Sequence, residues 1–175
     1  MLHAQTIAEI QFFLKVTGCE KCGRRVQWVL EELQFPAVPG NITVPTHCFS
    51  CKASTDLFFH VHHPHEPGTR SHPSSINPTD QTSQLIDLGQ WITLAYLLME
   101  ESRGKTDKEH SRYLNMQASQ CYDEALKFYD DPDNELPPPE AFFTETSRRR
   151  FRDAPQQFSR SRLLSEKGKL PSVPQ

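Results

Sequence analysis

Four of the five cysteines form two pairs with the same internal spacing, Cys19-Glu-Lys-Cys22 and Cys48-Phe-Ser-Cys51, and 25 residues separate the pairs. A CxxC pair folds into a tight turn, here called a knuckle, that offers two sulfurs to one ion. A second knuckle completes a tetrahedral thiolate site. We therefore predict a metal centre on these four side chains. Four thiolates leave no coordination position for water, so the metal is expected to be structural.

The cysteine usage also bears on the compartment. An odd number of cysteines with four in CxxC spacing fits metal binding under reducing conditions better than a disulfide framework. No signal-peptide pattern is visible, and the longest apolar stretch, residues 91–99, is too short to span a bilayer. These features predict a cytoplasmic protein without membrane association. Cys121 falls on the apolar stripe of a predicted helix and is expected to be a small buried side chain.

The segments around the knuckles have β character. Residues 7–17 are rich in apolar and β-prone types, and residues 41–46 and 55–62 read as strands that flank the second knuckle. Residues 24–34 suit either a strand or a helix face, and the sequence leaves that choice open.

Over residues 7–63 this pattern resembles a zinc ribbon. The matching features are Cys19-x-x-Cys22-Gly23, Val26-Gln-Trp28, a glycine turn, a strand into Cys48-x-x-Cys51, and Leu57-Phe-Phe. The resemblance implies one Zn²⁺ held by the four thiolates on two hairpin tips, in a family that docks protein or nucleic acid. Lys52 departs from the pattern, because a glycine usually follows the last cysteine. Rubredoxin-like sites use the same knuckles, so iron stays an alternative ion.

Thiol redox chemistry is a second alternative. If residues 24–34 form a helix, the segment from Gly18 through Cys22 resembles the opening of a thioredoxin or glutaredoxin. A helix N-terminus would lower the pKa of Cys19 and make it a nucleophile. Val44-Pro45-Thr46 is similar to the proline loop of that family, but it follows the first CxxC too early, and the second CxxC has no role in this interpretation.

The rest of the chain predicts helices. Residues 64–83 are rich in Pro, Ser, Thr and His and read as a linker. Apolar residues recur at helical spacing over 84–102, and Gly104 ends that segment. Thr106 and Glu109 have the spacing of a capping box that starts a second helix, which is expected to run to about residue 129.

Two shorter helices are expected near the end of the chain, over residues 140–149 and 155–167. The predicted fold class is α+β: a small β zinc ribbon followed by an antiparallel helical hairpin and short C-terminal helices. The predicted divisions are a zinc-ribbon-like module, a Pro/Ser/His linker, a helical region and a tail, over residues 1–63, 64–83, 84–167 and 168–175.

Two further clusters have possible chemistry. His60, His62, His63 and His65 form a cluster that could bind a transition metal or sense pH, but the favoured interpretation is a solvated strand end that runs into a Pro-rich loop. His47, beside Cys48, could substitute for a cysteine ligand but is not needed when four cysteines are present. Arg148, Arg149, Arg150 and Arg152, with Phe151 available for stacking, can contact nucleic acid, but such a run is commonly a solvated helix face.

Charge and motifs narrow the functional classes. Residues 76–135 contain five basic and twelve acidic side chains, net −7, which argues against a nucleic-acid surface over the whole protein. No phosphate loop, nucleophile elbow or HExxH motif occurs. The sequence therefore predicts a non-catalytic zinc-binding interaction or adaptor protein with a protein partner, and the alternatives are a thiol redox protein or a nucleic-acid-binding zinc ribbon.

Overall fold

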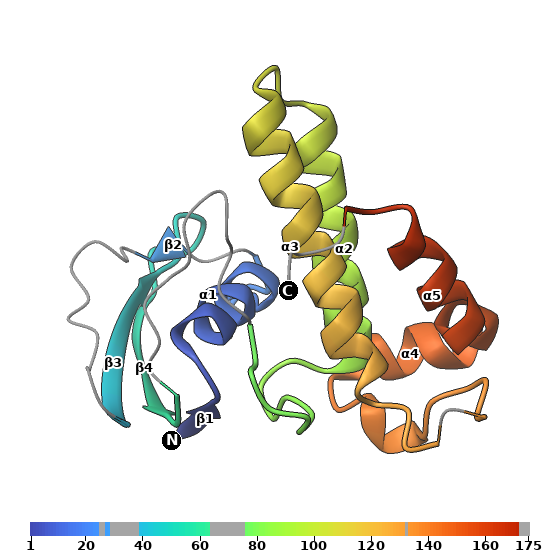
Figure 1. The fold of residues 1–175 in the computed structure, drawn as a ribbon. Helices are drawn as coiled ribbons and strands as arrows, with labels where there is room; N and C mark the ends of the chain where they lie inside the picture. The colour runs from blue at the N-terminus through green and yellow to red at the C-terminus, as the bar shows by residue number, and fades with distance from the viewer. Residues whose placement is uncertain (25–26, 29–38, 64–75, 132, 172–175) are drawn as a thin grey trace.

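The computed structural model describes residues 1–24, 27–28, 39–63, 76–131 and 133–171. The fold is mixed α/β: a four-stranded sheet with one helix on its inner face lies beside a group of helices (Figure 1). The order along the chain is β1, α1, β2, β3, β4 and then the helices α2 to α5. We refer to residues 1–63 as the sheet region and to residues 76–171 as the helical region.

The sheet has the strand order β1-β4-β3-β2. Its strands are β1 (Leu2–Ala4), β2 (Gln27–Trp28), β3 (Gly40–His47) and β4 (Ser54–Val61). β3 pairs antiparallel with both β4 and β2, whereas β1 pairs in parallel with β4. The expected strands over 41–46 and 55–62 are thus confirmed. Of the ambiguous residues 24–34, only the two in β2 are in a described element, and they form a strand.

The strand expected over residues 7–17 is wrong, because Ile7–Val16 forms helix α1. The Thr6 hydroxyl caps its first turn by accepting from the N–H of Glu9 at 3.2 Å. Ile7, Ile10 and Leu14 recur at helical spacing and are all buried. Burial of that stripe against the sheet outweighs the β propensity of the individual residues.

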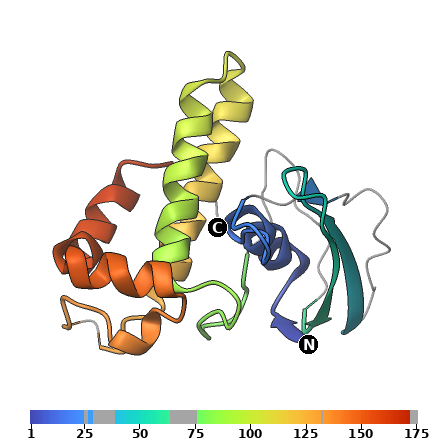
Figure 2. The same ribbon diagram turned by 180° about the vertical axis from the view of Figure 1, so that it is seen from behind.

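Helices α2 (Leu88–Arg103) and α3 (Lys108–Leu126) pack side by side and are joined by residues 104–107 (Figure 2). The Asp87 side chain caps α2 in a capping box with Gln90, so the helix begins four residues later than the pattern from residue 84 predicts. The capping box expected at Thr106 is also wrong. Asp107 is the N-cap of α3, where its carboxylate accepts from two backbone N–H groups, those of Glu109 and His110.

The C-terminal helices confirm two short elements with shifted bounds. A 3₁₀ turn, η2 (Pro139–Ala141), precedes α4 (Glu145–Asp153), and a second turn, η3 (Pro155–Phe158), precedes α5 (Arg160–Gly168). The prolines open 3₁₀ turns, and Thr144 and Ser159 then cap the true α-helices.

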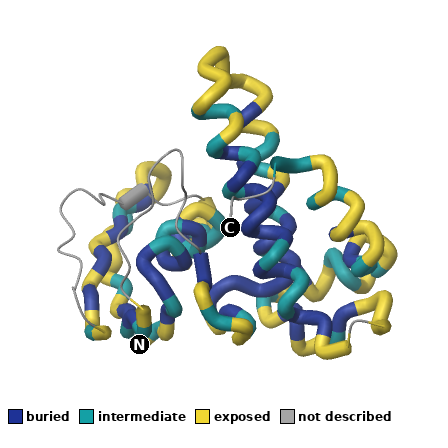
Figure 3. Tube along the Cα trace, viewed as in Figure 1, coloured by how far each residue is buried: buried dark blue, intermediate teal, exposed yellow. Residues whose placement is uncertain are grey.

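One continuous hydrophobic core joins the two regions. It runs from the inner face of the sheet through α1 to α2 and α3 (Figure 3), and the rings of Phe12 and Trp91 meet at 6.0 Å across the α1–α2 contact. Ile76 and Ser83, in the second half of the predicted linker, are buried, whereas residues 64–75 lie outside the described part of the chain. The division into domains stays a prediction. None of the helices among the described residues combines the length and apolarity that crossing a bilayer requires.

Candidate metal centre

The first knuckle follows the end of α1 and leads toward β2. Its backbone closes on itself: the N–H of Gly23 donates to the carbonyl of Cys19 at 2.7 Å, and the N–H of Cys19 donates to the carbonyl of Arg24 at 2.6 Å. Gly23 has a φ of +70°, in the left-handed region where glycine carries no steric penalty. This turn directs the side chains of Cys19 and Cys22 to the same side.

The second knuckle forms the tip of the β3–β4 hairpin and repeats this geometry. The N–H of Lys52 donates to the carbonyl of Cys48 at 2.8 Å, and the N–H of Cys48 donates to the carbonyl of Ala53 at 2.8 Å. Lys52, the residue that departs from the zinc-ribbon pattern, has a φ of +59°. It adopts the left-handed conformation despite its side chain, at a cost of roughly 1–2 kcal/mol. The departure therefore changes the energy of the knuckle and leaves its shape intact.

The four sulfurs converge on one point. Sγ of Cys19 lies 3.6 Å from that of Cys51, and Sγ of Cys22 lies 3.5 Å from that of Cys48. All four lie within 4.8 Å of one another. A tetrahedral ion with metal–sulfur bonds of about 2.3 Å has sulfur–sulfur edges of roughly 3.8 Å. The two close contacts each join one knuckle to the other, so the arrangement can hold a metal ion between the knuckles.

Backbone amides face the sulfurs and shape their acidity. The N–H of Cys51 and then contacts with Cys22 and the N–H of Ser50 lower the pKa of Cys48 to about 6, although burial opposes this. The N–H of Arg24 lowers the pKa of Cys22, but its neighbouring sulfurs, Cys48 first, and burial outweigh that contact and raise it to about 11. A bound dication deprotonates both thiols.

The surroundings of the sulfurs are asymmetric. Cys19 and Cys48 are buried, whereas Cys22 and Cys51 face solvent. The guanidinium of Arg24 donates to Ser50 Oγ at 3.3 Å and links the two knuckles. Phe49, at the tip of the second knuckle, is 55% exposed. His47 is not placed as a ligand, because its Nδ1 hydrogen-bonds to Ser54 Oγ at 3.0 Å and its ring packs edge-on against Phe49.

The histidine cluster lies at the other end of the same hairpin. His60 is in β4, and His62 and His63 follow it directly, whereas His65 lies outside the described residues. The structure adds His3, which the sequence analysis did not consider, because the parallel pairing of β1 with β4 brings His3 opposite His60. The sequence contains no local signal for that pairing.

The arginine run lies on α4 and is largely engaged within the protein. Arg148 donates to the carbonyl of Phe142 at 2.9 Å, and Arg150 donates to Thr93 Oγ1 at 2.7 Å. Phe151, which was expected to be available for base stacking, has one face stacked on Phe142, with the ring centres 4.4 Å apart. In addition, Arg152 pairs with Glu145 at 3.4 Å on the surface.

A buried polar group between α1 and α3 was missed by the sequence analysis. Glu9 and Glu124 are both buried, and one oxygen of each carboxylate lacks a hydrogen-bond partner. Lys127 Nζ contacts Glu124 at 2.9 Å and donates to the carbonyls of Asn77 and Thr79. Burial raises the pKa of Glu124 to about 7 and also raises that of Glu9, while Lys127 opposes both shifts. Cys121, as expected, is a buried core residue.

Comparison of this chain with protein-family models, with curated proteins and with solved structures gave no match. The interpretation of the site therefore rests on its own geometry.

Proposed function

We propose that the protein is a non-catalytic interaction module whose sheet region is held by one structural Zn²⁺ on Cys19, Cys22, Cys48 and Cys51. The observation that supports the ion is the pair of sulfur contacts between the knuckles, at 3.5 and 3.6 Å, close to the edge of a zinc–thiolate tetrahedron. Four protein sulfurs fill the coordination sphere. Such a site supplies folding free energy and leaves no position for a substrate.

The zinc-ribbon resemblance is part of this proposal. In its favour, the second knuckle is the tip of a hairpin, and the first leads to a strand that pairs antiparallel with β3. The helix α1 and the parallel strand β1 are additions to that pattern. The knuckles lie at the open end of the sheet, where Cys22, Phe49 and Cys51 are exposed, so an ion there supplies stability that local packing does not.

The interaction role rests on exposed aromatic side chains of the sheet region. Phe49 is 55% exposed beside the sulfurs, and Phe58 is 56% exposed on the outer face of β4. Metal binding requires neither ring, and aromatic residues are enriched at protein interfaces. We therefore propose a protein partner that contacts the second knuckle. Phe49→Ala should weaken binding of that partner while it leaves the four sulfurs unchanged. The matched control is Phe143→Ala in the helical region, where the side chain is 38% exposed, and it should leave binding unchanged.

Metal analysis of purified protein combined with chelation tests the proposal. We expect one zinc per chain, and we expect a strong chelator to unfold the sheet region reversibly. A coloured protein with thiolate-to-iron absorption would show that the bound ion is iron and not zinc. A metal-free protein that cycles a Cys19–Cys22 disulfide would replace the proposal by redox chemistry. The partner would be nucleic acid, and not protein, if the chain bound nucleic acid in a salt-sensitive way. That binding should be lost when four side chains are neutralised: Arg148, Arg149, Arg150 and Arg152.

A further inference from the structure

Three histidines lie together on the outer face of the sheet, the face turned away from α1. His3 pairs with His60 across the parallel strands β1 and β4, and His62 follows two residues later. The N–H of His62 donates to the carbonyl of Ala4 at 3.0 Å, which extends the pairing beyond the end of β4. Their neighbours Ala4, Phe59 and Val61 point to the opposite, buried face. The backbone therefore fixes where the three rings stand.

The distance between two of the rings, those of His3 and His62, suits a shared ion. His3 Nδ1 lies 3.4 Å from His62 Nε2. A tetrahedral zinc with bonds of about 2.1 Å to two imidazole nitrogens holds them roughly 3.4 Å apart. The ring centres of the three histidines form a compact triangle, with sides of 4.9 Å (His60–His62), 5.6 Å (His3–His62) and 5.8 Å (His3–His60).

The hydrogen bonding of His60 prepares it as a ligand. Its Nδ1 lies 2.8 Å from the side-chain oxygen of Asn41, which is its register partner on β3. An oxygen at that position accepts a hydrogen bond, so Nδ1 bears the proton and Nε2 keeps its lone pair. Metal-binding histidines are commonly oriented in this way by an acceptor on the opposite nitrogen.

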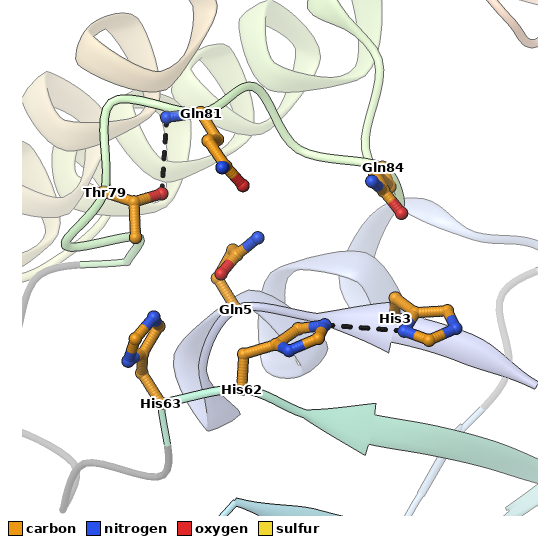
Figure 4. Close-up of a pocket in the computed structure, with 7 residues that line it drawn as sticks. All are labelled: His3, Gln5, His62, His63, Thr79, Gln81 and Gln84. Carbon is orange, nitrogen blue, oxygen red and sulfur yellow. Dashed lines mark hydrogen bonds between the residues drawn. The ribbon is translucent and has the colours of Figure 1, made fainter.

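The site is open to solvent and polar. His3 and His62 face each other at one side of a cavity of 440 Å³, and His63 lines the same space (Figure 4). Gln5, Thr79, Gln81 and Gln84 complete the lining, so the cavity offers neutral oxygen and nitrogen atoms.

We propose that His3, His60 and His62 form a second metal site, for a divalent late transition metal such as Zn²⁺ or Ni²⁺. The His3 and His62 nitrogens are already at the separation that a shared ion requires. The ring centre of His60 lies 4.9 Å from that of His62, and a rotation of the His60 side chain would bring in the third nitrogen. His3 and His62 line the cavity, so water or a small ligand can complete the coordination from there. β4 rises about 3.3 Å per residue, so this site lies roughly 23 Å from the second knuckle. It does not depend on the proposed role of the cysteines.

Titration of the zinc-loaded full chain with further Zn²⁺ tests this proposal. The amino group of Met1 is acetylated beforehand, because a free amine two residues before His3 is itself a metal ligand. We expect one additional zinc per chain by calorimetry. His3→Asn, His60→Asn and His62→Asn should each weaken that second event on the order of tenfold or more, whereas the control His110→Asn on α3 should leave it unchanged.

Nitrogen-detected NMR of the imidazoles supplies an independent readout. Zinc should shift the nitrogen resonances of His3 Nδ1 and His62 Nε2. As controls, every variant should still bind the first zinc equivalent and should keep the far-UV circular dichroism of the wild type. Failure to bind a second equivalent at millimolar zinc would overturn the proposal. It would also be overturned if His65→Asn with His72→Asn abolished the second event while His62→Asn preserved it, because the ion would then reside elsewhere.

Discussion

The sheet region and the helical region are organised around different kinds of polar centre. In the sheet region four sulfurs meet at the tip of a short hairpin, and two of them face solvent. In the helical region the buried carboxylate of Asp87 accepts from the amide of Gln90, from Thr144 and from Ser147. The second centre is complete with protein atoms, whereas the first is a cluster of four sulfurs that can hold a metal ion. Stability of the two regions should therefore respond to different changes.

The largest expected effect is that of removing one sulfur. Cys48→Ser should abolish metal binding and the amide protection of β3 and β4. Loss of the metal removes an apparent zinc-binding free energy on the order of 10 kcal/mol from the stability of the sheet region. Amides of α2 and α3 should stay protected. Hydrogen exchange with mass spectrometry measures both. The matched control is Cys121→Ala, which removes a buried thiol of the helical region and should keep the metal.

Asp87→Ala should produce the converse pattern. The variant removes the N-cap of α2 and leaves the hydroxyls of Thr144 and Ser147 without their acceptor. We expect a loss of about 4 kcal/mol in the free energy of unfolding, from one cap and two orphaned buried donors. Metal content should not change. Denaturant unfolding checks this, and a variant within about 1 kcal/mol of wild type would show that the Asp87 network contributes little.

The buried carboxylates at the boundary between the regions predict a pH dependence. Because the pKa of Glu124 is raised to about 7 in the folded protein, the fold favours the protonated carboxyl, and protonation of Glu124 contributes to the free energy of unfolding. The contribution is fully present below the unfolded pKa of about 4.5. It is lost as the pH rises through 7, by roughly 3 kcal/mol in total.

Glu124→Gln should flatten this decline between pH 5 and pH 8 in denaturant titrations, while the exposed control Glu100→Gln should keep it. Equal slopes in wild type and Glu124→Gln would mean that other groups set the pH dependence. Glu9→Gln should have the same sign, since burial raises the pKa of Glu9 as well.

The smallest expected effect concerns the second knuckle. Lys52→Gly should stabilise the metal-bound protein by about 1 kcal/mol, because glycine adopts the φ of +59° without strain. Gly23→Ala in the first knuckle should have the opposite sign and a similar size. Thermal unfolding of the two variants compares the knuckles directly. A destabilised Lys52→Gly protein would indicate that the lysine side chain, which lies over the Phe49 ring at 5.7 Å, outweighs the backbone strain.

The grouping of the four cysteines could be predicted from sequence because its signal is local. Each CxxC fixes its own turn, and residue types at two short motifs are enough to anticipate that the sulfurs share a site. The strands β3 and β4 were predicted for a related reason, since alternation along a hairpin is visible over a few residues. Lys52 shows the limit of such a pattern, because backbone geometry is retained despite an unfavourable residue.

The parts that were missed depend on contacts between distant residues. α1 was interpreted as a strand because Ile7, Phe13 and Val16 are β-prone, and only the sheet beneath it makes the helical stripe decisive. His3 joins His60 through a parallel pairing that spans most of the sheet region. Glu9 and Glu124 are buried polar residues on otherwise apolar helix faces, and nothing in their local sequence indicates that they are buried.

The central claim is that the two knuckles enclose one ion in a shell of four sulfurs. X-ray absorption spectroscopy of purified, reduced protein at the zinc edge tests it most directly. We predict four sulfur neighbours at about 2.3 Å and no nitrogen or oxygen in the first shell, in a sample that contains one zinc per chain. A first shell with two or three light atoms, or a protein that is folded and free of metal, would contradict the claim.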